Sequence, residues 1–320
     1  MMYRALSSLL VSSTLIACSA GGEPPDGEGA AGEGAASPSG GGVAGEGGGF
    51  GGAGGAPDTS GCKAVDVLFV IDNSGSMADN QASLVSSFPG FVAGMKEKLD
   101  AAPSYHVGVV TTDDYWGNAA GCQTIGDLVT QTSGHASSAA VCAPFSGDNR
   151  FMSEAESDLS SKFACAAQVG DTGSDDERVM RALLNALEPG RNAQGACNAG
   201  FSRLDALLVV VIITDEDDVA DGCDGQTCDS YGSGGDPDAW VAELLSYRGG
   251  IKENVVVLSL IGKGADNPCG AIPNSKILGF TNRFDDNGFT GDVCSSSYDA
   301  FFSAALPVID EACKTFEPPS

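Results

Sequence analysis

Four short runs of the chain are almost wholly apolar and rich in β-branched residues. They cover residues 65–71, 105–111, 207–214 and 255–261. A strand that is buried on both faces of a parallel sheet has this composition, because neither of its faces meets water. The pattern therefore predicts four buried strands.

Between these runs, apolar residues recur three or four positions apart, as they do along one face of a helix. This spacing predicts helices over about 84–99, 175–187, 236–245 and 298–312. Ser174 and Glu177 have the spacing of a capping box, and Asp236 followed by Pro237 is typical of a helix start. Pro89 and Pro307 are expected to kink or interrupt the helices that contain them.

Strands that alternate with helices predict an α/β fold, a doubly wound and mostly parallel sheet with helices on both faces. Residues 112–160 do not follow this alternation. They are polar and rich in Gly, Ser and Ala, and they contain Cys122 and Cys142. We expect a disulfide-pinned insertion at one edge of the sheet.

The first 18 residues form a predicted export signal. They carry an early Arg4 and an apolar run from 5 to 17 that is too short to span a bilayer. The run ends in Leu-Ile-Ala-Cys18, which resembles the lipobox of bacterial lipoproteins and implies lipidation of Cys18. Because Ser19 rather than Asp follows, the resemblance implies the outer membrane or cell surface. The alternative is a plain signal peptide with an incidental cysteine.

Residues 19–61 are predicted to be a flexible acidic tether. They hold 18 of the 45 glycines and almost no large apolar side chain, so they cannot bury enough surface to offset the entropy of ordering. The formal charge of the whole chain is -27. Such a charge disfavours nucleic acid as a partner and suits a surrounding that contains divalent cations.

Ten cysteines remain besides Cys18, an even number that indicates disulfides in an exported chain. A metal site is disfavoured because no CxxC occurs and the only histidines are His106 and His135. Spacing cannot fix the pairing. The working expectation is Cys122–Cys142, Cys165–Cys197, Cys223–Cys228 and Cys269–Cys294 between neighbours, with Cys62–Cys313 closing the domain.

The first predicted strand ends in the sequence DNSGS. Asp72, Ser74 and Ser76 are spaced two residues apart along a turn, so their oxygens can converge on one point. One carboxylate and two hydroxyls are hard ligands, suited to Mg²⁺, Mn²⁺ or Ca²⁺.

Two further segments are expected at the same edge of the sheet, where ligands of open α/β sheets bind. The run 207–214 leads directly into Asp215, and the loop 170–173 precedes a predicted helix. Oxygens from three loops are therefore expected to converge on one cation.

These residues resemble the von Willebrand factor A (vWA) domain with its metal-ion-dependent adhesion site (MIDAS). The family's Asp-x-Ser-x-Ser motif is matched by Asp72, Ser74 and Ser76. The resemblance implies Asp215 as the final aspartate and Thr172 as the threonine, with Asp171 as the alternative. It covers about residues 62–316 of a domain spanning 62–320, and it leaves 112–160 and 262–297 as insertions.

The resemblance also implies a function. One divalent cation, Mg²⁺ first and Mn²⁺ or Ca²⁺ otherwise, would keep a free coordination position for an Asp or Glu of a partner protein. A non-enzymatic, surface-anchored adhesion module is expected. The alternatives are a scaffold whose metal only ties loops together, and a metal-assisted hydrolase. A subtilisin-like protease is disfavoured because neither His106 nor His135 lies in a suitable segment.

Two smaller expectations concern the loops. Four acids after the third strand are expected in a solvated loop around Cys223–Cys228, with a second cation site as the alternative; they are Asp217, Asp218, Asp221 and Asp224. Tyr115 and Trp116 are expected either to pack the insertion or to form a rim that contacts a partner.

Overall fold

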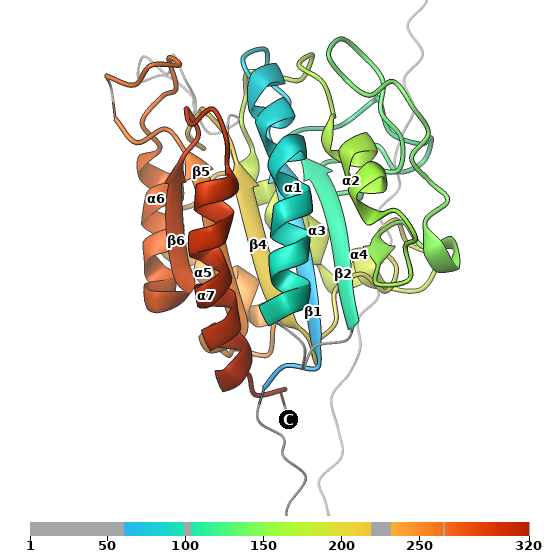
Figure 1. The fold of residues 1–320 in the computed structure, drawn as a ribbon, viewed down its shortest axis with the longest axis vertical. Coiled ribbons are helices and arrows are strands. Elements are labelled where there is room, and N and C mark those ends of the chain that lie inside the picture. The colour runs from blue at the N-terminus through green and yellow to red at the C-terminus, as the bar shows by residue number, and fades with distance from the viewer. Residues whose placement is uncertain (1–60, 99–103, 219–231, 265, 320) are drawn as a thin grey trace, which may run out of the picture. The chain divides into compact units, whose positions relative to one another are not determined.

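The computed structural model describes residues 61–98, 104–218, 232–264 and 266–319. The predicted signal peptide with Cys18, nearly all of the tether and the predicted Cys223–Cys228 bridge lie outside these residues. The described chain is an α/β unit around one six-stranded sheet, in the order β3-β2-β1-β4-β5-β6 (Figure 1).

The sheet is mixed but mostly parallel. Its strands are β1 Ala64–Ile71, β2 Ser104–Thr111, β3 Met152–Ser153, β4 Leu207–Ile213, β5 Val255–Ile261 and β6 Gly288–Asp292. All neighbours pair in parallel except β2 and β3. The four strands predicted from apolar runs are confirmed as β1, β2, β4 and β5, and every residue of β1, β4 and β5 is buried.

Helices cover both faces of the sheet. They are α1 Ala78–Lys98, α2 Leu159–Ala167, α3 Val179–Leu187, α4 Pro189–Asn192, α5 Pro237–Tyr247, α6 Ser275–Thr281 and α7 Asp299–Thr315. One face of β1, including Phe69, packs in a core with α1, α2 and α7, which lie in front of the sheet in Figure 1. The other face, including Leu68, packs in a second core with α3, α5 and α6.

Helix starts follow the local hydrogen bonds. The predicted cap of α5 is confirmed, because the Asp236 carboxylate accepts bonds from the N–H groups of Asp238 and Ala239, both at 3.0 Å. The predicted capping box of α3 is wrong. The Ser174 hydroxyl accepts the N–H of Asp176 at 3.0 Å, a local turn that competes with the helix, and α3 begins only at Val179.

The predicted insertions both contribute to the sheet or its covering layers. Residues 112–160 supply the edge strand β3, and residues 262–297 supply α6 and the opposite edge strand β6. Both α1 and α7 run through their internal prolines. Among the described helices, none combines the length and apolar character that a bilayer crossing requires.

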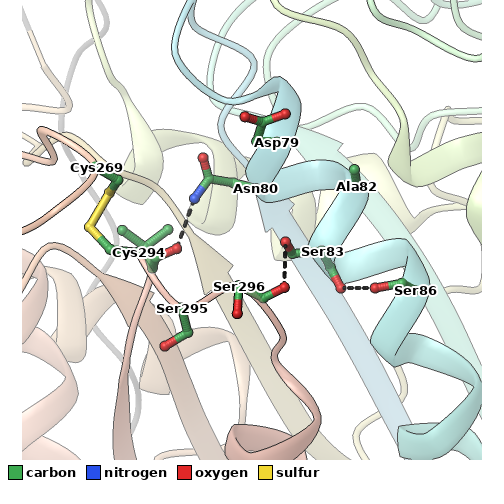
Figure 2. A pocket seen from close by; sticks show the side chains of 10 residues that line it. Asp79, Asn80, Ala82, Ser83, Ser86, Cys269, Cys294, Ser295 and Ser296 are labelled. Carbon is green, nitrogen blue, oxygen red and sulfur yellow. Dashed lines mark hydrogen bonds between the residues drawn. A yellow bond between two sulfur atoms is a disulfide. The ribbon is translucent and has the colours of Figure 1, made fainter.

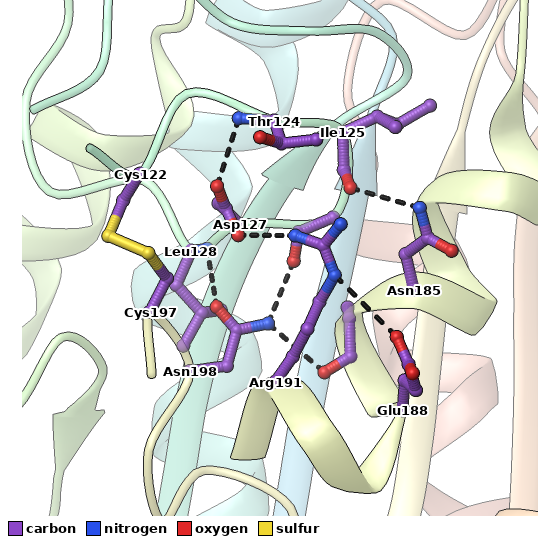
Figure 3. A network of polar contacts seen from close by, with 12 residues as sticks. Cys122, Thr124, Ile125, Asp127, Leu128, Asn185, Glu188, Arg191, Cys197 and Asn198 are labelled. Atoms are coloured by element: carbon purple, nitrogen blue, oxygen red, sulfur yellow. Dashed lines mark hydrogen bonds and ion pairs between the residues drawn. A yellow bond between two sulfur atoms is a disulfide. The ribbon is translucent and has the colours of Figure 1, made fainter. Parts of the chain in front are cut away.

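Two of the expected disulfides are confirmed and two are wrong. Cys62–Cys313 and Cys269–Cys294 are present, whereas Cys122 pairs with Cys197 and Cys142 with Cys165. The polar network in Figure 3 explains why Cys122 pairs with Cys197 and not with Cys142. The Asn198 side chain accepts the N–H of Leu128 at 2.9 Å, and this contact brings Cys197 beside Cys122.

This pairing gives the first prediction. Replacing both Cys122 and Cys197 by Ser should lower the free energy of unfolding by about 2–4 kcal/mol, because the bond closes a long loop in the unfolded chain. Urea denaturation measures the change. Protease digestion of the unreduced parent should yield a peptide pair that joins Cys122 to Cys197. A peptide pair joining Cys122 to Cys142 would contradict the pairing.

Candidate metal centre

The candidate site lies where the strand order reverses. From β1 the chain passes outward to β2 and β3, and it then returns to β4 on the other side of β1. Such a reversal leaves a crevice at the carboxyl ends of the two central strands. The N–H of Asp72 donates to the carbonyl of Ile213 at 3.0 Å. The segments that carry Asp72 and Asp215 therefore leave the sheet side by side.

Asp72 is fully buried and both of its carboxylate oxygens are fixed. One accepts the N–H of Ser74 at 2.7 Å, and the other accepts the hydroxyl of Thr214 at 2.7 Å. An Asp that bonds the backbone two residues later forms a tight turn, which explains the conformation of the DNSGS sequence. The turn also brings the hydroxyl oxygens of Ser74 and Ser76 to 3.5 Å from each other.

Asp215 faces the same point from β4. Its side chain is buried, and one carboxylate oxygen has no hydrogen-bond partner among the described residues. Burial raises the pKa of Asp215, whereas a hydrogen bond from the Ser76 hydroxyl lowers it. A buried carboxylate oxygen without a partner is costly, and a cation would satisfy it.

The electrostatics of Asp72 also favour a cation. Burial raises the pKa of Asp72 to about 6, and hydrogen bonds from Ser74 and Thr214 only partly offset this. The nearby Asp215 carboxylate raises the pKa of Asp72 further. A cation between the two carboxylates would remove this repulsion.

The third loop, 170–173, contacts the same turn. Gly173 donates its N–H to the carbonyl of Asn73 at 2.7 Å. The Gln81 amide joins the two loops, because its Nε2 donates to the carbonyls of Asp72 at 3.0 Å and of Gly170 at 2.8 Å. Its Oε1 accepts the N–H of Gly170 at 3.0 Å. The structure thus brings all three predicted loops together.

A histidine contacts Asp171, one of the two residues of the third loop that could be a cation ligand; the other is Thr172. The Nδ1 of His135 lies 2.8 and 2.9 Å from the two carboxylate oxygens of Asp171. Both carboxylate oxygens of Asp171 are therefore paired with a residue of the 112–160 segment. Thr172 is exposed and lines a pocket together with Asn73. The Thr172 hydroxyl oxygen lies beside Gly134, since a Cβ atom on Gly134 would be 2.9 Å from it. Among the described residues, no contact of Asp171 or Thr172 with Asp72 or Ser74 decides between them.

The contact between the loops gives the second prediction. A Cβ atom on Gly173 would lie 2.7 Å from the Asn73 carbonyl oxygen and 2.4 Å from its Nδ2, closer than real Cβ contacts. Gly173→Ala should therefore move the third loop outward and weaken cation binding about tenfold, while the fold persists. Calorimetric titration with Mn²⁺ measures this. Gly264→Ala is the control, because a Cβ atom there would meet open space and its backbone is not left-handed. Undiminished binding by Gly173→Ala would contradict the contact.

Glu177 was misassigned by the sequence pattern, which treated it as a helix cap. Its side chain is 1% exposed, and neither carboxylate oxygen has a hydrogen-bond partner among the described residues. Burial and the nearby Asp72 carboxylate raise the pKa of Glu177 to about 10. No local pattern in the sequence marks its burial, which comes from contacts with distant segments.

Two other acids correct the prediction of a solvated loop. Asp217 accepts the N–H groups of Lys276 and Ile277 and thereby caps α6. Asp218 is 1% exposed and accepts the N–H groups of Met180 at 2.7 Å and Ser233 at 2.7 Å. The loop that follows Asp215 is therefore fixed to helices on both sides. Asp221 and Asp224 lie outside the described residues.

Pockets flank the candidate site. One, of about 520 Å³, lies beside the first turns of α1 and the Cys269–Cys294 bond (Figure 2). There the Nδ2 of Asn80 donates to the carbonyl of Val293 at 2.9 Å. The other, of about 480 Å³, is lined by Asn73, Gly173 and Trp116 among others.

The fold and the site define an α/β protein with an oxygen-rich candidate cation site at the carboxyl edge of its sheet. The site combines two carboxylates with hydroxyls. Across the described ranges, no group of three or more His, Cys, Asp or Glu side chains is arranged to hold a metal ion.

No family model and no curated protein matches the chain. Two solved structures align with 78% of it, both at 13% identity. Proximal thread matrix protein 1 from the mussel byssus aligns over 48% of its own length with a TM-score of 0.40. The pilus adhesin SpaC of Lactobacillus rhamnosus GG, in an open conformation, aligns over 30% with a TM-score of 0.39. The chain thus spans less than half the length of either protein.

Proposed function

We propose that this chain is a vWA domain whose MIDAS binds one divalent cation and, through that cation, an acidic group of a partner protein. The ligands would be Asp72, Ser74, Ser76, Thr172 and Asp215. The observation that carries the proposal is the unpartnered oxygen of Asp215, buried beside Asp72 and the Ser76 hydroxyl. Mg²⁺ fits this donor set best, with Mn²⁺ and Ca²⁺ as alternatives.

The charge of the donor set explains how a partner would be held. Two carboxylates neutralise a divalent cation without making the site anionic. Hydroxyls are weak donors and leave part of the coordination shell to water. The cation therefore stays attractive to an incoming Asp or Glu, which would replace a water. This chemistry requires no catalytic residue, so we propose a binding protein and not an enzyme.

The proposed place of the domain follows from the N-terminal sequence. Lipidation at Cys18 would anchor the chain to the outer membrane or cell surface. Residues 19 to 61 would then connect this anchor to the domain.

A structural role is the second candidate, because a cation here would join three loops that Gln81, Asp217 and Asp218 already fix. Capture of a random phage-displayed peptide library in Mg²⁺, with elution by EDTA, separates the two. The binding proposal predicts eluted peptides that share an Asp or Glu, with no binding once that acid is changed to its amide. A cation that raises the melting temperature while no peptide is eluted by EDTA would support the scaffold instead.

A further inference from the structure

The strand β6 forms an edge of the sheet, and within the described ranges it pairs with β5 alone. The N–H of Val293, directly after β6, donates to the carbonyl of Ile261 at 3.1 Å. Because the backbone groups of successive strand residues point to opposite sides, Gly291 faces β5 as Val293 does, whereas Thr290 and Asp292 face outward. This edge therefore presents backbone donors and acceptors that another strand could bind.

Lys263 lies across this outward edge. Its side chain is exposed, and its Nζ donates to the carbonyl of Thr290 at 2.9 Å, in the middle of the five-residue strand. A lysine at an edge hinders another strand from pairing there, since its ammonium would lose its partner and its water. An incoming strand that brings its own carboxylate removes this obstacle, because the ammonium can pair with the acid and free the Thr290 carbonyl.

A pocket of about 370 Å³ lies beside the same edge. Its lining includes Lys263, Thr290 and Leu278, and Lys263 is the only charged residue among the described residues that line it. Leu278 of α6 is 39% exposed, one of the few large apolar side chains of the described chain left in solvent. The pocket thus combines one cation with one apolar surface along an open strand, in a chain of net charge -27.

The side chains of β6 divide between the two helices, α6 and α7, that flank the strand in Figure 1. Phe289 stacks on Phe301 of α7, with ring centroids 5.3 Å apart. On the other face, a Cβ atom on Gly288 would lie 2.2 Å from the carbonyl oxygen of Thr281 in α6. Thr290, two residues after Gly288, therefore points to the face of α6, where it lines the pocket. A strand added beside β6 would place every second side chain over this pocket.

A second copy of this chain fits the edge poorly. Two β6 strands that pair about a two-fold axis would bring the Lys263 side chains of both copies to the shared edge, because each lies at the middle of its strand. Like charges there repel, and both copies also carry a net charge of -27. An extended segment of another protein can instead meet Lys263 with an acid.

We propose that the β6 edge binds an extended segment of a partner protein as an added strand. An acidic side chain of this segment pairs with Lys263, and an apolar side chain two positions away packs on Leu278. Backbone hydrogen bonds to Thr290 hold the segment in register. The cation plays no part, since β5 separates β6 from the two strands that lead to Asp72 and Asp215. Binding at this edge therefore persists in EDTA.

Two synthetic peptides, added to the protein in EDTA, test the edge. The probe is the fluorescein-labelled peptide Thr-Val-Thr-Glu-Thr-Val-Thr, whose Glu and Val side chains share one face, and the second peptide has Gln in place of Glu. Fluorescence anisotropy should show that the Glu peptide binds at least fivefold more tightly than the Gln peptide. Lys263→Met should bind the two equally, since it keeps an unbranched apolar side chain and loses the charge. Lys63→Met, at an exposed lysine directly before β1, is the matched control and should keep the preference.

Two further measurements test the apolar contact and the added strand. Leu278→Ser should weaken binding of both peptides at least threefold and leave the preference for Glu intact. The Glu peptide should slow amide hydrogen exchange at Thr290, whose N–H would donate to the added strand.

Three results would overturn the proposed strand binding. They are equal affinity of the parent protein for the two peptides, no binding of the Glu peptide up to about 1 mM, and unchanged exchange at Thr290. A parent protein that dimerises and protects Thr290 without peptide would show that a second copy occupies the edge, and would also overturn it. All of these results leave the proposed cation site standing, because every measurement is made in EDTA.

Discussion

Replacing Asp72 by Asn is expected to weaken divalent-cation binding at least 100-fold, which corresponds to about 2.7 kcal/mol. The change removes one of the two carboxylates that face the site. It keeps the shape of the side chain, and the Asn oxygen can still accept the N–H of Ser74 at the place where Asp72 does. Calorimetric titration with Mg²⁺ and Mn²⁺ measures the loss, and circular dichroism confirms that the fold persists.

Asp79→Asn is the matched control for Asp72→Asn. Asp79 is exposed in the first turn of α1, close to the candidate ligands in sequence but outside the proposed set. Removing its charge should change the cation affinity less than threefold. The assignment of Asp72 is contradicted if the two variants lose affinity equally, or if Asp72→Asn binds as the parent does.

Without cations, the protein is expected to become more stable as the pH falls from 8.5 to 7. The pKa of Glu177 is about 10 in the folded protein and near its ordinary value of 4.5 in the unfolded chain. Between these values the unfolded chain binds fewer protons than the folded protein. Stability therefore falls as the pH rises, by up to about 1.4 kcal/mol per pH unit for one proton.

Comparison with Glu177→Gln separates Glu177 from other buried acids, because burial also raises the pKa values of Asp113, Asp215 and Asp218. Asp66 and Asp72, whose pKa values burial raises to about 6, act below pH 7. Burial lowers the pKa of His106 to about 4. This residue makes stability rise with pH, but only below about pH 6.5. Urea denaturation in EDTA at several pH values measures the slope, which Glu177→Gln should flatten. A parent without the slope, or a variant that keeps it, would contradict the buried neutral acid.

The central strands could be predicted from the sequence because their burial on both faces leaves a continuous apolar run. The edge strands could not. β3 has only two residues, and β6 reads Gly-Phe-Thr-Gly-Asp with all five positions half-buried. Edge positions relax the demand for apolar side chains, so the local sequence loses the signal on which the prediction depended.

The disulfide pairs and the start of α3 failed for a related reason. The partner of Cys122 is decided by where the Asn198 side chain docks, 70 residues from its bond to Leu128. The spacing of the cysteines along the sequence does not predict that contact. The capping box at Ser174 and Glu177 has the correct residues, but Glu177 is buried beside Asp72 instead of capping a helix.

The candidate site shows the same division between local and distant contacts. The DNSGS turn is local, and Asp215 follows a recognisable strand, so both were predicted from the sequence. The bridge from Gln81 to Gly170 joins residues 89 apart and leaves no local pattern. The acids Asp217 and Asp218 suggested a solvated loop because acidic runs usually face water. They are buried because α6 and α3 each present free N–H groups to them.

Anomalous diffraction from crystals soaked in Mn²⁺ tests the shared cation site most directly. We expect one strong peak between Asp72, Ser74, Ser76 and Asp215, within about 2–2.5 Å of the serine hydroxyl oxygens. The peak should be absent from crystals of Asp72→Asn. A protein that binds Mn²⁺ in solution but shows no peak at these residues, or shows its peak elsewhere, would contradict the proposed site.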